Sequence, residues 1–182
     1  MEKATEEDRL ASEDAAEATR GTIALVDGTL WPCWSWDGER ELWSGKYKTT
    51  GHGSLIVANL QGRITFVSEP VTGNQHDMSK LKGSAVEKIL KEAGGVFGDK
   101  GFIGTDYITT PIRKPECREL LQWEHEWNNQ VSSFRAGRAR RRHLEDTADS
   151  LHRLPPAAED LQVIVQSRNR TLLLQGTFWI TL

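Results

Sequence analysis

Two short strings, Val26-Asp27-Gly28-Thr29 and Gly98-Asp99-Lys100-Gly101-Phe102, decide the fold that this chain is expected to adopt. Each places an acidic residue beside a glycine directly after a short apolar run of β type. A predicted helix separates the two runs, and a strand that follows a crossover helix usually lies parallel to the earlier strand in the same sheet. Asp27 and Asp99 are therefore predicted to emerge at one edge of a sheet.

The segments around these strings alternate between strand and helix patterns. Gly28-Thr29 is predicted to turn the chain so that residues 30–36 return as a second strand. Residues 51–60 and 63–68 have the pattern of a hairpin that turns at 59–62. Residues 79–93 carry an apolar stripe at helical spacing, and residues 116–138 repeat apolar side chains every three or four positions. The predicted fold class is α/β, with antiparallel and parallel strands in one mixed sheet.

Composition fits one ordinary domain with tails: 182 residues, 37% hydrophobic, with a net charge of -3. The charge is uneven, because residues 1–20 hold seven acids against three bases, whereas residues 135–143 hold five arginines, one histidine and no acid. The acidic end suggests a frayed helix or disorder, and the basic run suggests a nucleic-acid contact. No apolar run approaches the ~18 residues that a membrane helix needs, and two cysteines without CxxC spacing favour a reducing, cytoplasmic setting.

The two aspartates suit a particular chemistry. Carboxylates at neighbouring strand ends are the ligands that Mg²⁺ and Mn²⁺ prefer. Two such ions ~3.5–4 Å apart can activate an attacking oxygen and stabilise the leaving oxygen in phosphodiester cleavage. Asp27 and Asp99 are thus the candidate catalytic and metal-binding residues, and a third acid from a nearby helix is expected to complete the site.

Each of these residues also has a structural interpretation. Asp27-Gly28 is a common turn dipeptide, Asp99 between glycines suits a turn, and Asp77 suits the start of a helix, where it would cap backbone N–H groups. A zinc site built from Cys33, His52, His76 and Cys117 has irregular spacing and is disfavoured. The tryptophans at 31, 34, 36 and 43 fit core and hairpin packing better than a base-stacking surface.

Taken in order, six strings resemble one family. They are 26–29, 44–52, 67–77, 98–104, 111–115 and 128–135, and together they are similar to the DDE-superfamily endonuclease domain of bacterial insertion-sequence transposases, in the branch akin to Harbinger-type elements. The resemblance covers roughly residues 22–136. It implies an RNase H-like fold and metal-dependent cleavage and transfer of DNA strands at transposon ends.

The resemblance also assigns positions. The family's first acid corresponds to Asp27 and its second to Asp99, with Mg²⁺ or Mn²⁺ as the implied cofactor, while His76-Asp77 matches an accompanying string of open role. The third acid is a glutamate four residues after an arginine. That arginine corresponds to Arg135 and the glutamate position to Ala139, so the third acid is missing and the chain is expected to be inactive. Glu145 or Asp146 as a substitute lies about six residues further, ~9 Å along a helix.

Residues from 137 onward are consistent with the family's C-terminal stretch translated in a shifted reading frame, which the coding DNA would decide. The expected division is an acidic tail over 1–21, an RNase H-like domain over 22–136, and an out-of-frame tail over 137–182. The helical DNA-binding region that the family carries before its first acid is expected to be absent. Two alternatives remain: a non-catalytic transposase remnant that binds DNA weakly through the arginines, and a generic α/β binding module whose aspartates have no catalytic role.

Overall fold

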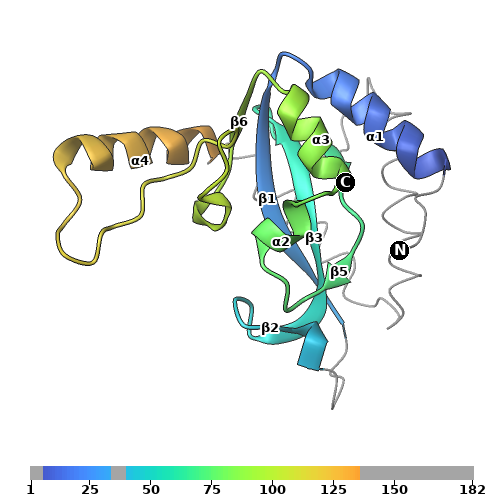
Figure 1. Ribbon diagram of the computed structural model, residues 1–182, viewed down its shortest axis with the longest axis horizontal. Coiled ribbons are helices and arrows are strands. Elements are labelled where there is room, and N and C mark those ends of the chain that lie inside the picture. The colour runs from blue at the N-terminus through green and yellow to red at the C-terminus, as the bar shows by residue number, and fades with distance from the viewer. Residues whose placement is uncertain (1–5, 34–39, 136–182) are drawn as a thin grey trace.

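The fold is a six-stranded mixed sheet with helices, seen in a computed structural model that describes residues 6–33 and 40–135 (Figure 1). The main strand order is β2-β3-β1-β6, and β4 and β5 also pair with β3. The strands are β1 (Ile23–Pro32), β2 (Trp43–Ser44), β3 (Thr49–Asn59), β4 (Ile64–Val67), β5 (Val71–Thr72) and β6 (Gly95–Phe97). Because β1 runs antiparallel to β3 and parallel to β6, the predicted mixed α/β class is confirmed, and it is consistent with an RNase H-like fold.

The helices are α1 (Glu6–Thr19), α2 (Asp77–Leu81), α3 (Ala85–Glu92) and α4 (Gln122–Arg135), with short 3₁₀ turns η1 (Arg40–Leu42) and η2 (Lys100–Phe102). In Figure 1, α1 and α3 lie together beside the central strands, whereas α4 extends away on the opposite side. The main core forms where alternate residues of β1 and β3 meet α3. Val26, Leu55, Val57, Val86 and Phe102 are its best-buried members. None of the described helices is long and apolar enough to cross a bilayer.

The predicted turn at Gly28-Thr29 is wrong, because β1 continues straight through it. β1 pairs with β3 over nine consecutive residue pairs, from Ala24 with Asn59 to Pro32 with Gly51. A turn at Gly28 would have broken this ladder, and each unpaired backbone group in a sheet interior costs free energy. Asp27 therefore lies in the middle of β1 and not at its end.

The hairpin prediction at 59–62 is confirmed by the antiparallel pairing of β3 with β4. The single helix predicted over 79–93 is instead two short helices, α2 and α3. Gly83 separates them with a φ of 74°, a left-handed conformation that favours glycine. Ser84 and Glu87 then start α3 with a capping box: the Glu87 N–H donates to the Ser84 hydroxyl, and the Gly83 N–H donates to the Glu87 carboxylate.

The N-terminal segment differs from the expected frayed or disordered tail, because α1 packs into the domain. Ala15 and Ala16 are buried within the main core. Arg20, just after α1, forms an ion pair of 2.7 Å with Glu92 at the end of α3. The sequence suggested little apolar surface here, but small alanine side chains allow α1 to pack against α3.

Helix α4 begins later than the predicted residue 116. Glu124, in the first turn, accepts a hydrogen bond of 2.7 Å from the backbone N–H of Leu121, which fixes the helix start there. Arg118 donates two hydrogen bonds to the same carboxylate, at 2.6 and 2.8 Å. The residues between 116 and 121 thus form a connection that folds back onto the helix start.

Candidate active site

The strand pairing brings Asp27 and Asp99 to one rim of the sheet. The parallel ladder between β1 and β6 pairs Leu25 with Phe97. Asp27 lies two residues after Leu25, and Asp99 lies two residues after Phe97. Residues at matching positions in parallel strands lie side by side. The strand-helix-strand order thus brings the two segments side by side, but Asp27 follows the last residue of β1 that pairs with β6 and does not end β1 itself.

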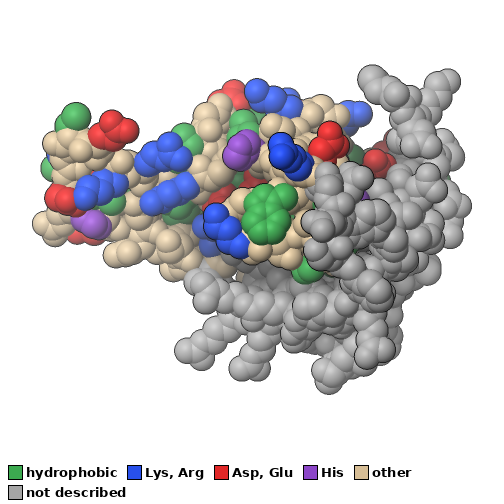
Figure 2. All heavy atoms as spheres, turned by 90° about the horizontal axis from the view of Figure 1, so that it is seen from below, with side chains coloured by type: hydrophobic (Ala, Val, Ile, Leu, Met, Phe, Trp, Pro, Cys, Tyr) green, Lys and Arg blue, Asp and Glu red, His purple; other side chains and the backbone are tan. Residues whose placement is uncertain are grey.

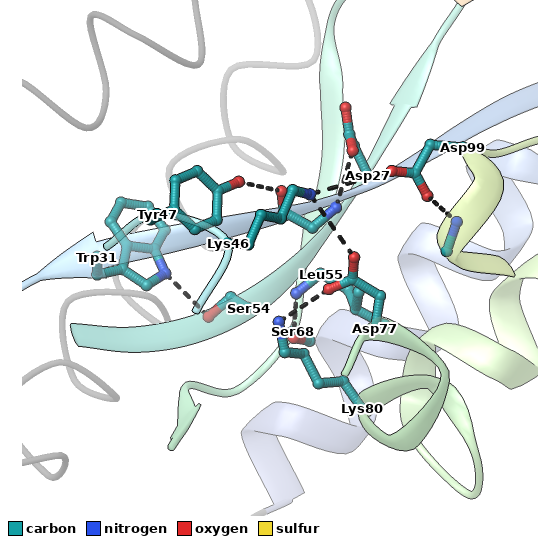
Figure 3. A network of polar contacts seen from close by, with 12 residues as sticks. Asp27, Trp31, Lys46, Tyr47, Ser54, Leu55, Ser68, Asp77, Lys80 and Asp99 are labelled. Atoms are coloured by element: carbon teal, nitrogen blue, oxygen red, sulfur yellow. Dashed lines mark hydrogen bonds and ion pairs between the residues drawn. The ribbon is translucent and has the colours of Figure 1, made fainter. Parts of the chain in front are cut away.

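A lysine lies among the acids at this rim (Figure 3). The Nζ atom of Lys46, from the loop between β2 and β3, is 4.0 Å from Oδ2 of Asp99 and 3.9 Å from Oδ2 of Asp77. Burial alone would lower the pKa of Lys46, but electrostatic interactions with Tyr47 and with the carboxylates of Asp77, Asp99 and Asp27 outweigh burial and raise that pKa. The Lys46 ammonium is therefore the cation at the centre of a carboxylate cluster.

Asp77 is brought to the same rim by α2, of which it is the first residue. Its Oδ1 accepts a hydrogen bond of 2.9 Å from Nζ of Lys80, one turn later in the helix. The helix N-cap is His76, which is exposed and makes no side-chain capping bond. The capping role considered for Asp77 is thus replaced by a contact with lysine side chains.

Asp99 contacts both the backbone and the side chains of the rim. Its Oδ1 accepts a hydrogen bond of 2.8 Å from the N–H of Gly101, so that it caps the short η2 turn. The turn interpretation of this residue is therefore correct, but it leaves Oδ2 directed at Lys46. One carboxylate thus combines a backbone hydrogen bond through Oδ1 with an ion pair through Oδ2 at the rim.

Asp27 meets the end of α4. Nη2 of Arg135 is 3.6 Å from Oδ2 of Asp27, and the Arg135 side chain is only 19% exposed. The stacking of Phe97 in β6 on Phe134, with ring centroids 4.9 Å apart, holds the helix end in place. The arginine that the sequence singled out therefore lies against Asp27.

The rim is electrically balanced within the described residues. Asp27, Asp77 and Asp99 face three bases: Arg135, Lys80 and Lys46. The Lys80 side chain is 7% exposed and that of Lys46 is 56% exposed. Of these three cations, Lys46 is therefore the one that solvent and ligands reach most easily.

Sequence patterns alone did not assign roles to Lys46 and Lys80. Lys46 belongs to the 44–52 string, and its position directly after a serine-glycine pair in a loop was the available signal. Lys80 lies within the helix predicted over 79–93. Its spacing of three residues from Asp77, which suits an ion pair on one helix face, is the signal that could have identified it.

Comparison with sequence families settles the relationship of the chain. The sequence model of the family described as DDE superfamily endonuclease matches residues 26–146. The chain belongs to this family. The match begins just before Asp27 and includes Asp77, Asp99 and Arg135, so this DDE endonuclease domain contains the whole rim. Comparisons with curated proteins and with solved structures give no match.

The match also extends to residue 146, ten residues beyond the boundary expected at 136. Ala139, Glu145 and Asp146 lie in this extension and outside the described residues, as do Trp34, Trp36 and most of the arginine-rich run. Among the described tryptophans, Trp31 is buried and donates to the hydroxyl of Ser54 at 2.9 Å, as packing predicts. Trp43 is exposed.

The residues of the DDE endonuclease rim fit a divalent cation in chemical type. Their side-chain donors are carboxylate oxygens, which hard cations prefer, and a positive charge already lies between two of them. No three His, Cys, Asp or Glu side chains of residues 6–33 and 40–135 are arranged so that they could hold a metal ion together.

Proposed function

We propose that this chain is a transposase-type DDE endonuclease domain in which Asp27 and Asp99 hold Mg²⁺ or Mn²⁺ against DNA. The observation that supports this most strongly is that the two acids meet at one rim, beside a central cation, in a chain of the DDE superfamily endonuclease family. A bound divalent ion would polarise the phosphate and activate the attacking oxygen.

The residues around the acids support a DNA substrate. Lys46, Lys48 and Lys100 are exposed, and all three lie in segments that border the rim. In the view from below, Lys and Arg side chains gather between α4 and the body of the domain (Figure 2). Lysines that border a carboxylate pair can contact phosphates on either side of the reacting group, so DNA binding should weaken steeply with salt.

The missing third acid leads to the expectation that this chain cannot cleave DNA. Two carboxylates hold a two-ion site poorly, and Arg135 already occupies the side of Asp27 that faces α4. The test is a nicking assay on supercoiled plasmid with Mg²⁺ or Mn²⁺, in which no nicking is expected. Nicking that disappears in Asp27→Asn would refute inactivity, and the same result would establish the endonuclease assignment.

Metal binding tests the site independently of cleavage. Titration calorimetry with Mn²⁺ should show binding in the full chain and no binding in Asp27→Asn or Asp99→Asn. Absence of binding in the unmodified chain would refute the metal site.

A second candidate function is a non-catalytic remnant that binds DNA through the arginines of residues 135–143. The observation in its favour is the local charge of five arginines without an acid. A gel shift of plasmid fragments that disappears as salt rises, and that weakens when these arginines are replaced by glutamine, would support it. A shift that is insensitive to salt would contradict it.

A further inference from the structure

Two exposed aromatic side chains belong to the short hairpin that carries Lys46. Tyr47 lies in the loop between β2 and β3, and Trp43 is the first residue of β2. Tyr47 is 46% exposed and Trp43 is 48% exposed. We infer that these two rings stack on unpaired bases, so that the DNA held at the rim is a single strand and not an intact duplex. This inference rests on the proposed function and narrows its substrate class.

Tyr47 lies against the strand that carries the first acid. Its hydroxyl donates a hydrogen bond of 3.1 Å to the backbone carbonyl of Gly28, the residue after Asp27 (Figure 3). β6 pairs with β1 only as far as Leu25, and the loop contacts β1 beyond that point. A base that stacked on the Tyr47 ring would therefore lie beside the carboxylate rim, and so would the phosphate of the same nucleotide.

The loop between β2 and β3 is a tight turn with a fixed shape. Ser44 pairs with Thr49, and the Lys48 N–H donates to the Ser44 carbonyl at 2.8 Å. Lys48 has a φ of 56°, a left-handed conformation that is uncommon for a residue other than glycine and costs free energy. Such strain persists where the surrounding contacts enforce it, and it clusters at functional sites. The turn therefore presents Tyr47 between two lysines without further ordering.

Cations accompany the Tyr47 ring on both sides in the chain. The Lys46 ammonium is 5.3 Å from the ring centroid, and Lys48, which is exposed, follows Tyr47 directly. Because Lys46 also pairs with acids of the rim, Lys48 is the cation expected to contact phosphate first. Proteins that bind single strands combine aromatic rings, on which bases stack, with cations that contact phosphates. In a duplex the base faces are covered by neighbouring bases, so an exposed ring finds no stacking partner there.

Packing, which the sequence favoured for Trp43, does not account for its position. Trp31, on a neighbouring strand, is 3% exposed and donates to the Ser54 hydroxyl at 2.9 Å, as a packed tryptophan should. Trp43 leaves half of its surface exposed on the same hairpin as Tyr47. Exposed apolar surface that is bordered by charged residues is typical of an interaction site.

The experiment measures binding of the full chain to fluorescent oligonucleotides by anisotropy, in EDTA so that neither metal nor cleavage contributes. A single strand of about 20 nucleotides is compared with the blunt duplex of the same sequence, and the single strand should bind about 10-fold more tightly. Tyr47→Ala and Trp43→Ala should each weaken single-strand binding about 5- to 100-fold, the range for loss of one stack between a base and a ring. Both variants should bind the duplex as the unmodified chain does.

Matched variants separate stacking from other roles. Tyr47→Phe keeps the ring and loses the hydrogen bond to Gly28, so it should bind the single strand nearly as well as the unmodified chain. Trp123→Ala removes a tryptophan that is 58% exposed near the start of α4, at the opposite end of that helix from Arg135, and should change neither affinity. Lys48→Gln should weaken binding of both DNA forms and reduce its salt dependence.

The outcomes separate this inference from the proposed function. If the chain binds duplex without preferring the single strand, the stacking role is refuted and the DDE endonuclease assignment stands. Equal losses of single-strand affinity in Tyr47→Phe and Tyr47→Ala would refute it as well, because the hydroxyl and not the ring would then be required. So would a loss in Trp123→Ala as large as that in Trp43→Ala. If the chain binds neither form, the DNA substrate of the proposed function is itself refuted.

Discussion

The sheet rim and helix α4 are held in place by different kinds of interaction. The rim rests on long backbone ladders above a buried apolar core, with Val26 and Leu55 fully buried beneath it. Helix α4 buries only Glu124 and Val131 and leaves several large side chains exposed, namely Trp123, Trp127 and Phe134. It is attached by separate polar and aromatic contacts, such as those of Asn128 with Ile112 and of Phe134 with Phe97.

This difference matters for the site, because each region contributes to it. The rim supplies Asp27, Asp77 and Asp99 from elements that share one core, whereas α4 supplies only Arg135. Stability is not uniform across a protein, and regions with few buried apolar contacts open at lower free energy. The carboxylates should therefore stay in place under conditions in which the contribution of α4 is lost.

The largest effect is expected from the core beneath the rim. Leu55→Ala should reduce the free energy of unfolding by about 2–5 kcal/mol, because Leu55 is fully buried and its removal leaves a cavity. Leu121→Ala, directly before α4, where the side chain is 48% exposed, should change it by less than about 0.5 kcal/mol. Urea denaturation followed by circular dichroism measures both. Equal losses in the two variants would contradict the contrast between the regions.

The next effect concerns the glycine beside the first acid. Gly28→Ala should cost about 1–3 kcal/mol, because the added methyl group collides with the Asp77 carboxylate and displaces it. Gly45→Ala, where a Cβ meets nothing within 4 Å, is the control. Thermal denaturation should separate the two variants. Indistinguishable melting temperatures would show that Asp77 is not held against Gly28.

A smaller, local effect is expected where α4 is attached. Asn128 accepts from the Ile112 N–H at 2.7 Å and donates to the Ile112 carbonyl at 3.1 Å. Asn128→Ala should lose both bonds and favour local opening by about 1–2 kcal/mol. Hydrogen exchange should then be faster at the Ile112 amide and unchanged at Val57 in β3. Asn129→Ala, at an exposed position, should leave both rates as they are.

The smallest effect is a pH dependence at the start of α4. The Arg118 guanidinium, which hydrogen-bonds Glu124, and the Leu121 N–H lower the pKa of Glu124 to about 2. Since an unperturbed glutamate has a pKa of about 4.3, this contact stabilises the fold fully above that pH. Its contribution is lost as the pH falls toward about 2. Glu124→Gln should show a smaller loss of stability than the unmodified chain between about pH 5 and about pH 2.5. Urea denaturation at a series of pH values measures this loss.

Local sequence was informative where one segment decides its own conformation. The hairpin at 59–62 and the acid at the end of β6 were predicted because a turn or a short apolar run suffices to specify them. Gly28 was misassigned to a turn, because the dipeptide Asp-Gly by itself does not distinguish a turn from a position within a strand. Only the nine-pair ladder with β3 and the approach of Asp77 distinguish them.

The same limit applies to the charges at the rim. The order of strand, helix and strand was enough to bring Asp27 and Asp99 together, because the handedness of such connections leaves little choice. It was not enough to place Lys46 or Asp77, whose positions depend on a loop and on a short helix. Neither segment has a strong pattern of its own.

The sequence by itself determined the family, the mixed sheet and the edge at which two acids meet. Hydrophobic periodicity and the order of strands and helices depend on residues that are close together in the chain. Only the tertiary structure decided which cation lies between the acids, which third carboxylate joins them and how α4 reaches Asp27. Those contacts join segments that are distant in the chain, and electrostatic interaction depends on distances that no local pattern records.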